Sequence, residues 1–392
     1  MDSQHQKFCL NSIGKVIAQL EAYQHAMRLL LLSTFLISFG SAVYSQSAQS
    51  KPEQLFENFW KEFDENYALF EVKGVDWQQT YTTYRKQINA KTSDQELIAV
   101  FRQMLDPLKD GHINIFQKNK RLYKGESKNN SFRTEFQDVE KEFWMNVNAL
   151  LQQQGFGAPQ PKGALVDGSF TKAVPPMYVS RNNEIGYIRF TRFFNQLKGV
   201  MGSDKDELAD QKELAKLVDE ALSEYSTCKS LIIDLRDNGG GHSGYELAGR
   251  FISDSALVNY KSIRVNAKFS PLKEYWVKPF SSIRFIKPIV ILTSDRTASA
   301  AEDFTLSLSK FPNVTIIGTA TKGMFSDTYS FELPNKMETS LSNQLYYDTN
   351  KIILEDRGVA PTVEMRNTRK DIEAKTDAVL MRAFEELKSK GK

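Results

Sequence analysis

The stretch PIVILTSDRTASAAED, residues 288–303, joins two different patterns. It begins with consecutive apolar residues, which is typical of a buried strand, and the residues 304–310 that follow it, FTLSLSK, continue as a helix. Ser299 therefore lies where a strand turns into a helix. The spacing S-x-x-E to Glu302 also fits a helix-capping box, so the residues alone allow either a nucleophile or a cap at this position.

Strand and helix patterns alternate around this junction. Because strands alternating with helices form an α/β layer around a largely parallel sheet, we predict that fold class here. Function in such sheets collects at the carboxyl ends of the strands. Strands are predicted at 185–193, 230–236, 287–293 and 313–318, and helices at 206–225 and from Ser299 onward.

Three further regions are distinguished by composition. Residues 52–110 repeat large apolar and aromatic residues at helical spacing, which predicts an N-terminal helical subdomain. Residues 117–180 are polar and include the Gly- and Pro-rich stretch GFGAPQPKG, so we expect a loop-rich insert there. The α/β pattern occupies 184–392 and is predicted to be the catalytic core.

The N-terminus has the features of an export signal. Met27 and Arg28 precede an apolar run of about 15 residues, which is short for a membrane span but fits a secretory signal. We predict a signal peptide at 27–45, preceded by an uncertain extension at 1–26, and no membrane span after cleavage. The alternative is an amphipathic or membrane-anchoring helix.

Charge and cysteine content exclude several classes of function. A net charge of +3 is small for 392 residues and points to no nucleic-acid or acidic-lipid partner. Cleavage after residue 45 would leave Cys228 as the only cysteine, and His112 and His242 as the only histidines. An exported protein of this composition has no internal disulfide, and we expect no metal site and no cofactor.

The segment DLRDNGGGHSG, residues 234–244, supplies three consecutive glycines. Backbone N–H groups without side chains can approach an anion closely, as an oxyanion hole requires. Dinucleotide binding is disfavoured, because polar residues separate this segment from the apolar strand and no ribose-binding acid follows at the usual distance. A less favoured alternative is an esterase that uses Ser243 with His242.

A general base must accompany any serine nucleophile, and histidine suits that role near neutral pH. His112 follows Gly111 in LKDGHI, and His242 borders the glycine segment. Spacing along the chain does not choose between these two histidines.

Taken in order, four motifs resemble a known family. DLRDNGGG, TSDRTASAAED, IIGTATKGMFSD and EDRGVAP resemble the catalytic core of the tail-specific, or C-terminal processing, serine proteases, and LKDGH resembles the branch related to the tricorn protease core. The resemblance implies a ClpP/crotonase-like layered sheet core with an N-terminal helical subdomain. The insert lacks a convincing PDZ carboxylate-binding loop, which favours a general peptidase acting on peptides or unfolded chains.

The resemblance also implies roles for individual residues. Ser299 corresponds to the nucleophile, His112 to the general base and Glu355 to the group that orients the base. The oxyanion hole would consist of the backbone N–H of Ala300 and a glycine of the NGGG segment, Gly239 or Gly240. Another branch uses a lysine base at the position that is Met324 here, so Lys322, two residues away, is a poor substitute.

The sequence thus predicts an exported serine endopeptidase, periplasmic or extracellular, whose substrates are peptides or unfolded proteins. The alternative is a non-catalytic protein on the same fold that binds an apolar, retinoid-like ligand or a peptide. Abundant aromatic residues, 26 Phe and 15 Tyr, are compatible with such a cavity.

Overall fold

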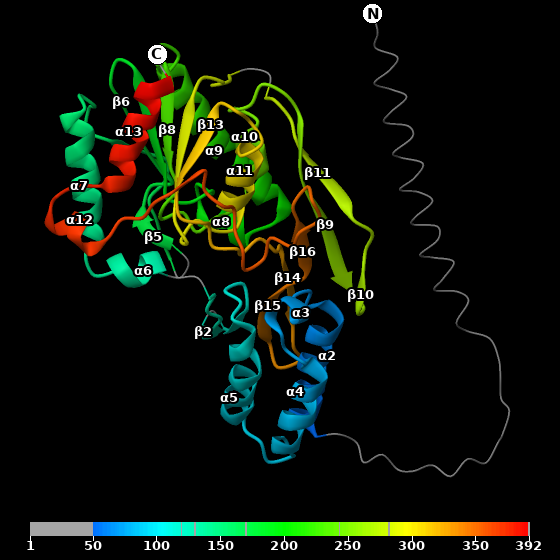
Figure 1. Cartoon of the computed structure of the whole chain (residues 1–392). Helices are drawn as coiled ribbons and strands as arrows, with labels where there is room; N and C mark the ends of the chain where they lie inside the picture. The colour runs from blue at the N-terminus through cyan, green and yellow to red at the C-terminus, as the bar shows by residue number, and fades with distance from the viewer. Residues whose placement is uncertain are drawn as a thin grey trace, which may run out of the picture. The chain divides into compact units, whose positions relative to one another are not determined.

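A seven-stranded sheet with the order β17-β13-β12-β8-β7-β6-β3 forms the centre of the fold (Figure 1). The strands from β17 to β7 run parallel, and β6 and β3 extend one edge antiparallel, which confirms the predicted α/β class. The strands are β3 Gln160–Lys162, β6 Met177–Arg181, β7 Ile185–Phe190, β8 Ser230–Asp234, β12 Ile289–Thr293, β13 Val314–Gly318 and β17 Val363–Glu364.

The computed structural model describes residues 50–118, 120–128, 131–168, 171–242, 244–280 and 283–390. The predicted extension 1–26 and signal peptide 27–45 lie outside the described residues. Within the part of the chain that is described, no helix combines the length and apolar character needed to cross a membrane.

Alternation along the central strands directs side chains to two separate cores. Leu231, Ile233, Ile289 and Ile291 pack on one side of the sheet, where helices α9 Asp204–Glu224, α10 Gly244–Ala248 and α11 Ala300–Leu308 contribute to the same apolar cluster. Ile232, Val290 and Leu292 pack on the other side with α7 Glu140–Gln153 and α13 Ala378–Lys390. Both faces are covered, which is why β8 and β12 are buried along their whole length and are apolar at 231–233 and 289–292.

The polar segment 117–180 contains more regular structure than its composition suggests. It holds β2 Lys120–Lys124, α6 Ser131–Phe136, α7, β3, β4 Val166–Gly168 and β5 Thr171–Val174. In α7 the buried positions Phe143, Val147 and Leu151 recur every four residues among Lys, Asn and Gln. The average composition of such a helix is polar even though one face is apolar.

The N-terminal helices form a separate aromatic core. They are α2 Lys51–Asn66, α3 Phe70–Lys73, α4 Trp77–Tyr84 and α5 Asp94–Leu105, with short 3-10 turns η1 Arg85–Gln87 and η2 Asp106–Leu108. Phe59 is completely buried and stacks on Phe101 with ring centroids 3.7 Å apart. Leu333, Met337 and Leu341, from far along the chain, belong to the same cluster.

Two smaller sheets connect these cores. The sheet β14-β15-β1-β2 combines β1 Asn114–Gln117 and β2 with β14 Thr328–Glu332 and β15 Met337–Ser342. The other contains β9 Ala256–Val265, β10 Lys268–Phe269, β11 Lys273–Val277 and β16 Gln344–Tyr347. The remaining helices are α8 Leu197–Met201 and α12 Arg369–Glu373. Because β15 pairs with β1, the turn before β1 is held by a strand more than 200 residues away.

Replacing Phe59 by alanine is expected to destabilise the fold by about 3–5 kcal/mol, because the change leaves a cavity among packed rings. Urea denaturation followed by far-UV circular dichroism measures the change. Lys61→Ala, on the exposed side of the same helix, is the control and should shift the free energy of unfolding by less than ~0.5 kcal/mol. A similar small effect for Phe59→Ala would contradict the packing described here.

Candidate active site

Ser299 occupies the turn between β12 and α11, at the carboxyl end of the parallel strands. Its backbone has φ 54° and ψ −128°, a conformation that costs a non-glycine residue about 1–3 kcal/mol and that clusters at functional sites. Ser299 and Glu302 occupy the positions of a capping box, but no N–H of a described residue donates a capping hydrogen bond to the Ser299 hydroxyl. Its N–H lies 3.1 Å from both the Met324 carbonyl and Glu302 Oε2. The main chain of Ser299 is thus held in place, and its hydroxyl is not used to cap the helix.

The glycine segment lies directly against this serine. A Cβ at Gly240 would sit 2.7 Å from Ser299 Cβ and 3.2 Å from the Ala300 nitrogen, closer than real contacts allow. Gly240 also has φ +101°, which side chains rarely tolerate. Its N–H donates to Asn238 Oδ1 at 2.8 Å, and its carbonyl accepts from Phe193 at 2.8 Å. Only glycine fits at this position, so Gly240, Ser299 and Ala300 are brought together.

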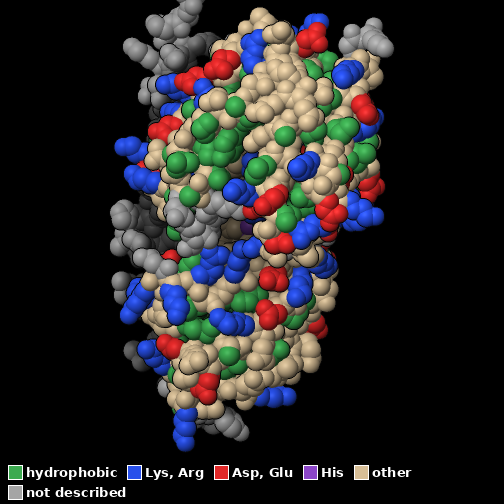
Figure 2. Space-filling view, turned by 90° about the vertical axis from the view of Figure 1, so that its left-hand side faces the viewer, with side chains coloured by type: hydrophobic (Ala, Val, Ile, Leu, Met, Phe, Trp, Pro, Cys, Tyr) green, Lys and Arg blue, Asp and Glu red, His purple; other side chains and the backbone are tan. Residues whose placement is uncertain are grey.

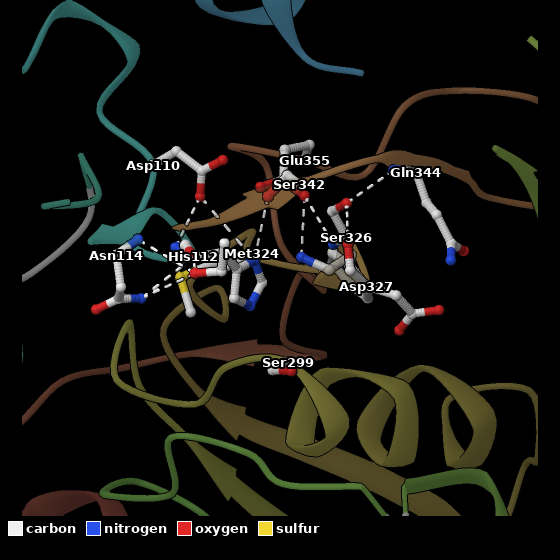
Figure 3. A network of polar contacts seen from close by, with 12 residues as sticks. Asp110, His112, Asn114, Ser299, Met324, Ser326, Asp327, Ser342, Gln344 and Glu355 are labelled. Carbon is white, nitrogen blue, oxygen red and sulfur yellow. Dashed lines mark hydrogen bonds and ion pairs between the residues drawn. The ribbon is translucent and has the colours of Figure 1, made fainter. Parts of the chain in front are cut away.

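His112 lies in the turn between η2 and β1 and is mostly buried, with 12% of its side chain exposed. Its N–H donates to Asp110 Oδ1 at 2.9 Å, and its carbonyl accepts from Ser340 Oγ at 2.7 Å. The ring Nδ1 lies 3.3 Å from Ser342 Oγ and 4.0 Å from Asp110 Oδ1 (Figure 3).

Burial is the main cause that lowers the pKa of His112 below its usual value of 6.5. Lys73 lowers it further, while Asp110 and Asp327 act in the opposite direction. A lowered pKa leaves the imidazole neutral at neutral pH. It can then accept a proton, as a general base must.

Met324 connects the serine to the histidine turn. Its carbonyl accepts the Ser299 N–H, and its sulfur lies 2.8 Å from the position that a Cβ would take at Gly111, the neighbour of His112. The glycine at 111 therefore makes room for this contact. In Figure 3 Met324 lies beside His112, and Ser299 lies below them at the start of its helix.

Two buried carboxylates hold the segment around Met324. Glu302 accepts the N–H groups of Gly323 at 2.7 Å and Met324 at 2.8 Å. Glu355 accepts those of Phe325 at 2.9 Å and Ser326 at 3.2 Å. Burial raises the pKa of Glu302 to about 7 although these hydrogen bonds lower it. The Glu302 side chain, which the sequence marked only as part of a capping box, is thus structural support for the site.

Glu355 is buried, and the charged groups of Asp110 and Lys73 act on its carboxyl group. Burial, followed by the Asp110 carboxylate, raises its pKa well above the usual value, and Lys73 opposes this. Its hydrogen bonds with described residues go to the Phe325 and Ser326 backbone, whereas the ring of His112 is hydrogen-bonded to Ser342. No sequence pattern singled out Ser342, because a serine in a polar strand has no distinguishing signature.

His242 makes a different contact. Its Nε2 lies 2.9 Å from Asp210 Oδ2, and Asp210 also accepts the N–H groups of Asn195 and Gln196. This cluster attaches α9 to the glycine segment and gives His242 a structural partner. Ser243, the nucleophile of the esterase alternative, lies outside the described residues.

This geometry is typical of serine-type peptidases, and comparison with known proteins identifies the chain as one. Residues 184–365 match peptidase family S41, and residues 48–106 match the tricorn protease C1 domain. The region 184–365 belongs to the S41 family of serine peptidases.

Individual relatives agree with this assignment. The carboxy-terminal processing protease CtpA of Bacillus subtilis is 23% identical over 374 residues, which cover 84% of this chain and 73% of the relative. A candidate peptidase from Parabacteroides merdae is 25% identical, with a TM-score of 0.66 over 86% of this chain and 97% of its own. Mature CPAF shares the fold, with a TM-score of 0.55, 14% identity and coverage of 83% and 94%.

Gly240→Ala should reduce the rate of serine labelling by a fluorophosphonate probe at least ~100-fold, because the added methyl group displaces Ser299 or the loop. Gly157→Ala is the matched control, since a Cβ there meets nothing within 4 Å, and it should label at the wild-type rate. Normal labelling of Gly240→Ala would show that the loop does not contact the serine as described.

Proposed function

We propose that the protein is an exported serine endopeptidase in which Ser299 attacks the peptide carbonyl. The conformation and contacts of Ser299 carry the proposal. Ser299 is held in a strained conformation against Gly240, with its hydroxyl outside the helix cap, while Met324 ties its backbone to the turn that carries His112. A strained residue with an uncommitted hydroxyl at the end of a buried strand is what nucleophilic catalysis needs.

His112 acts as the general base. The neutral ring must present a lone pair to Ser299 Oγ, and in the proposed tautomer, which carries its hydrogen on Nδ1, Ser342 Oγ beside Nδ1 acts as the acceptor. Nε2 then takes the proton from Ser299 and later returns it to the leaving amine. Ser342 stabilises the imidazolium form by accepting the Nδ1–H hydrogen bond.

The tetrahedral oxyanion is stabilised by backbone N–H groups. Ala300 begins α11, where the first N–H groups have no partner within the helix and the helix dipole is positive. Of the two glycines predicted to assist, the N–H of Gly240 already donates to Asn238. We therefore assign the second donor to Gly239, with Gly240 providing the close approach to Ser299.

Glu355 supports the base indirectly. Its carboxyl group holds the Phe325 and Ser326 backbone, next to the strand and turn that contact His112. Asp110, which binds the His112 N–H, faces the ring from its own turn. In this proposal Glu355 orients the histidine through the packing of these segments, with Ser342 as the direct contact.

Peptides and unfolded chains are the proposed substrates, and the signal predicted at 27–45 would deliver the enzyme outside the cytoplasm. The family relationship supports peptide hydrolysis. The CtpA relative is named for processing at carboxyl termini, and such processing is one form that the activity of this chain can take.

Labelling with a fluorophosphonate probe, followed by peptide mass spectrometry, tests the proposed function. Label is expected on Ser299 and should be lost in Ser299→Ala and reduced at least ~1,000-fold in His112→Ala. Ser309→Ala, at the exposed end of the same helix, should label like the wild type. A folded wild-type protein that takes no label, or Ser299→Ala that still hydrolyses peptides, would contradict the proposal and favour a binding protein.

The pH dependence of kcat/KM should reflect the lowered pKa of His112. Activity requires the neutral ring, so it is lost as pH falls through that pKa, and the acid limb should be centred below 6.5. Ser342→Ala removes an acceptor that stabilises the imidazolium form, so the limb should move to still lower pH and kcat/KM should fall ~10-fold.

Ser340→Ala is the control for this measurement. The Ser340 hydroxyl donates to the backbone carbonyl of His112, whereas Ser342 contacts the ring. Its acid limb should stay where the wild-type limb is. An identical profile for Ser342→Ala and wild type would remove Ser342 from the mechanism.

A further inference from the structure

Cationic side chains from separate segments gather beside the candidate active site. Lys124, at the end of β2, pairs in register with Asn114, two residues from His112. On the serine side, the guanidinium of Arg296 lies 3.8 Å from the position of a Cβ at Gly239. The loop of Lys322 is joined to the same turn, because the Lys322 N–H donates to the Thr297 carbonyl at 2.9 Å. These residues therefore come from both sides of the site.

The cations are close enough to act on one another. Burial lowers the pKa of Lys124, and Arg133, Arg121 and Arg296 lower it further. Burial likewise lowers the pKa of Lys322 to about 8, with Arg296 as the next cause. Like charges that depress one another's pKa lie in a region of positive potential. We call these five residues, Arg121, Lys124, Arg133, Arg296 and Lys322, the cationic rim.

Fewer acidic than basic side chains lie near the rim, and several of the acidic ones are hydrogen-bonded or ion-paired within the protein. Asp295 accepts hydrogen bonds from the hydroxyl of Ser131 and from the N–H groups of Ser131 and Phe132 at the start of α6, the latter at 2.9 Å. Asp237 Oδ1 lies 3.4 Å from Arg296 Nε, Glu126 acts on Lys124, and Glu302 acts on Lys322. These carboxylates compensate the rim only in part, so it retains a local excess of positive charge.

The surface of the molecule shows the same arrangement. In Figure 2 a histidine side chain is visible in a hollow, and Lys and Arg side chains lie along its border together with Asp and Glu side chains. A local excess of one sign of charge around a hollow concentrates ligands of the opposite charge.

We propose that the cationic rim selects peptide substrates that carry Asp or Glu side chains close to the bond that is cleaved. The inference rests on the proposed peptidase function and names the class of substrate. A carboxylate side chain next to the scissile bond would lie within reach of Lys124 on one side of the cleft and Arg296 on the other. Arg296 can bind a carboxylate through two N–H groups, which adds geometric preference to the attraction.

Internally quenched peptides with Glu, Gln or Lys at each position flanking the cleavage site test this proposal. Both ends are blocked, by acetylation and amidation, so that no terminal charge contributes. We expect kcat/KM about 3- to 10-fold higher for Glu than for Gln at one or more positions, and lower for Lys than for Gln. The Glu preference should shrink as salt is raised from about 0.05 to 0.5 M, because salt screens partly exposed charges.

Variants connect the preference to the rim. Arg296→Gln and Lys124→Gln should each reduce the Glu-over-Gln ratio roughly 2- to 5-fold. Lys229→Gln is the control, since Lys229 is an exposed lysine before β8, at the opposite end of the parallel strands. Its ratio should equal that of the wild type.

The results separate this proposal from the one on which it rests. Equal rates for Glu and Gln peptides, in an enzyme whose Ser299 is labelled by the fluorophosphonate probe, would overturn the proposed selectivity and leave the peptidase intact. Matched peptides with a free carboxyl terminus give a second comparison. A preference that appears with these peptides and is absent from the blocked ones would also overturn the proposed selectivity, because capture of the terminal carboxylate would then explain the charge of the rim.

Discussion

The buried carboxylate of Glu302 is the contact on which the geometry of the site depends. It accepts hydrogen bonds from Thr321 Oγ1 and from the N–H groups of Gly323, Met324 and Ser299. A carboxylate withdrawn from water is stable only when such donors replace its hydration. One side chain thereby joins the start of α11 to the loop that also contacts the histidine turn. The spacing that looked like an ordinary helix cap serves here to hold two loops together.

The proposed nucleophile and the proposed base belong to different hydrophobic cores. Ala300, next to Ser299, packs in the core that the α/β sheet shares with α9 to α11. His112 is flanked by Leu108 and Ile113, which belong to the aromatic core of the N-terminal helices. The chain crosses between the cores at β14 and β15, and the carbonyl of Ser342 accepts the Ala68 N–H of the helical part. The relative placement of the two cores therefore sets the distance between Ser299 and His112, and helps to explain why small contacts such as Gly111 against Met324 matter.

Local patterns predicted the strands and helices of the core well, because the central strands contain consecutive apolar residues and each covering helix has an apolar face. The secondary structure of the insert was harder to predict, because polar residues stand between the buried apolar positions of α7. Among site residues, Ser299 and the glycines could be found because a strand-to-helix turn and a run of glycines are local features. Ser342 and Met324 could not be found in this way. Ser342 matters because it contacts His112, 230 positions away, and Met324 matters because it contacts Ser299 and Gly111.

The sequence by itself determined the α/β class, the helical N-terminal unit and the chemical types available at the site: one serine at a helix start, two histidines in the predicted mature chain, and a run of three glycines that follows a strand. Only the tertiary structure decided which groups contact His112, the proposed base. In the structure Ser342 contacts the ring of His112, Glu355 accepts hydrogen bonds from the backbone of the neighbouring loop, and His242 pairs with Asp210. The reason is physical. Secondary structure follows from interactions between near neighbours, whereas the partner of a buried polar group is set by which distant segments the two cores bring within hydrogen-bonding distance.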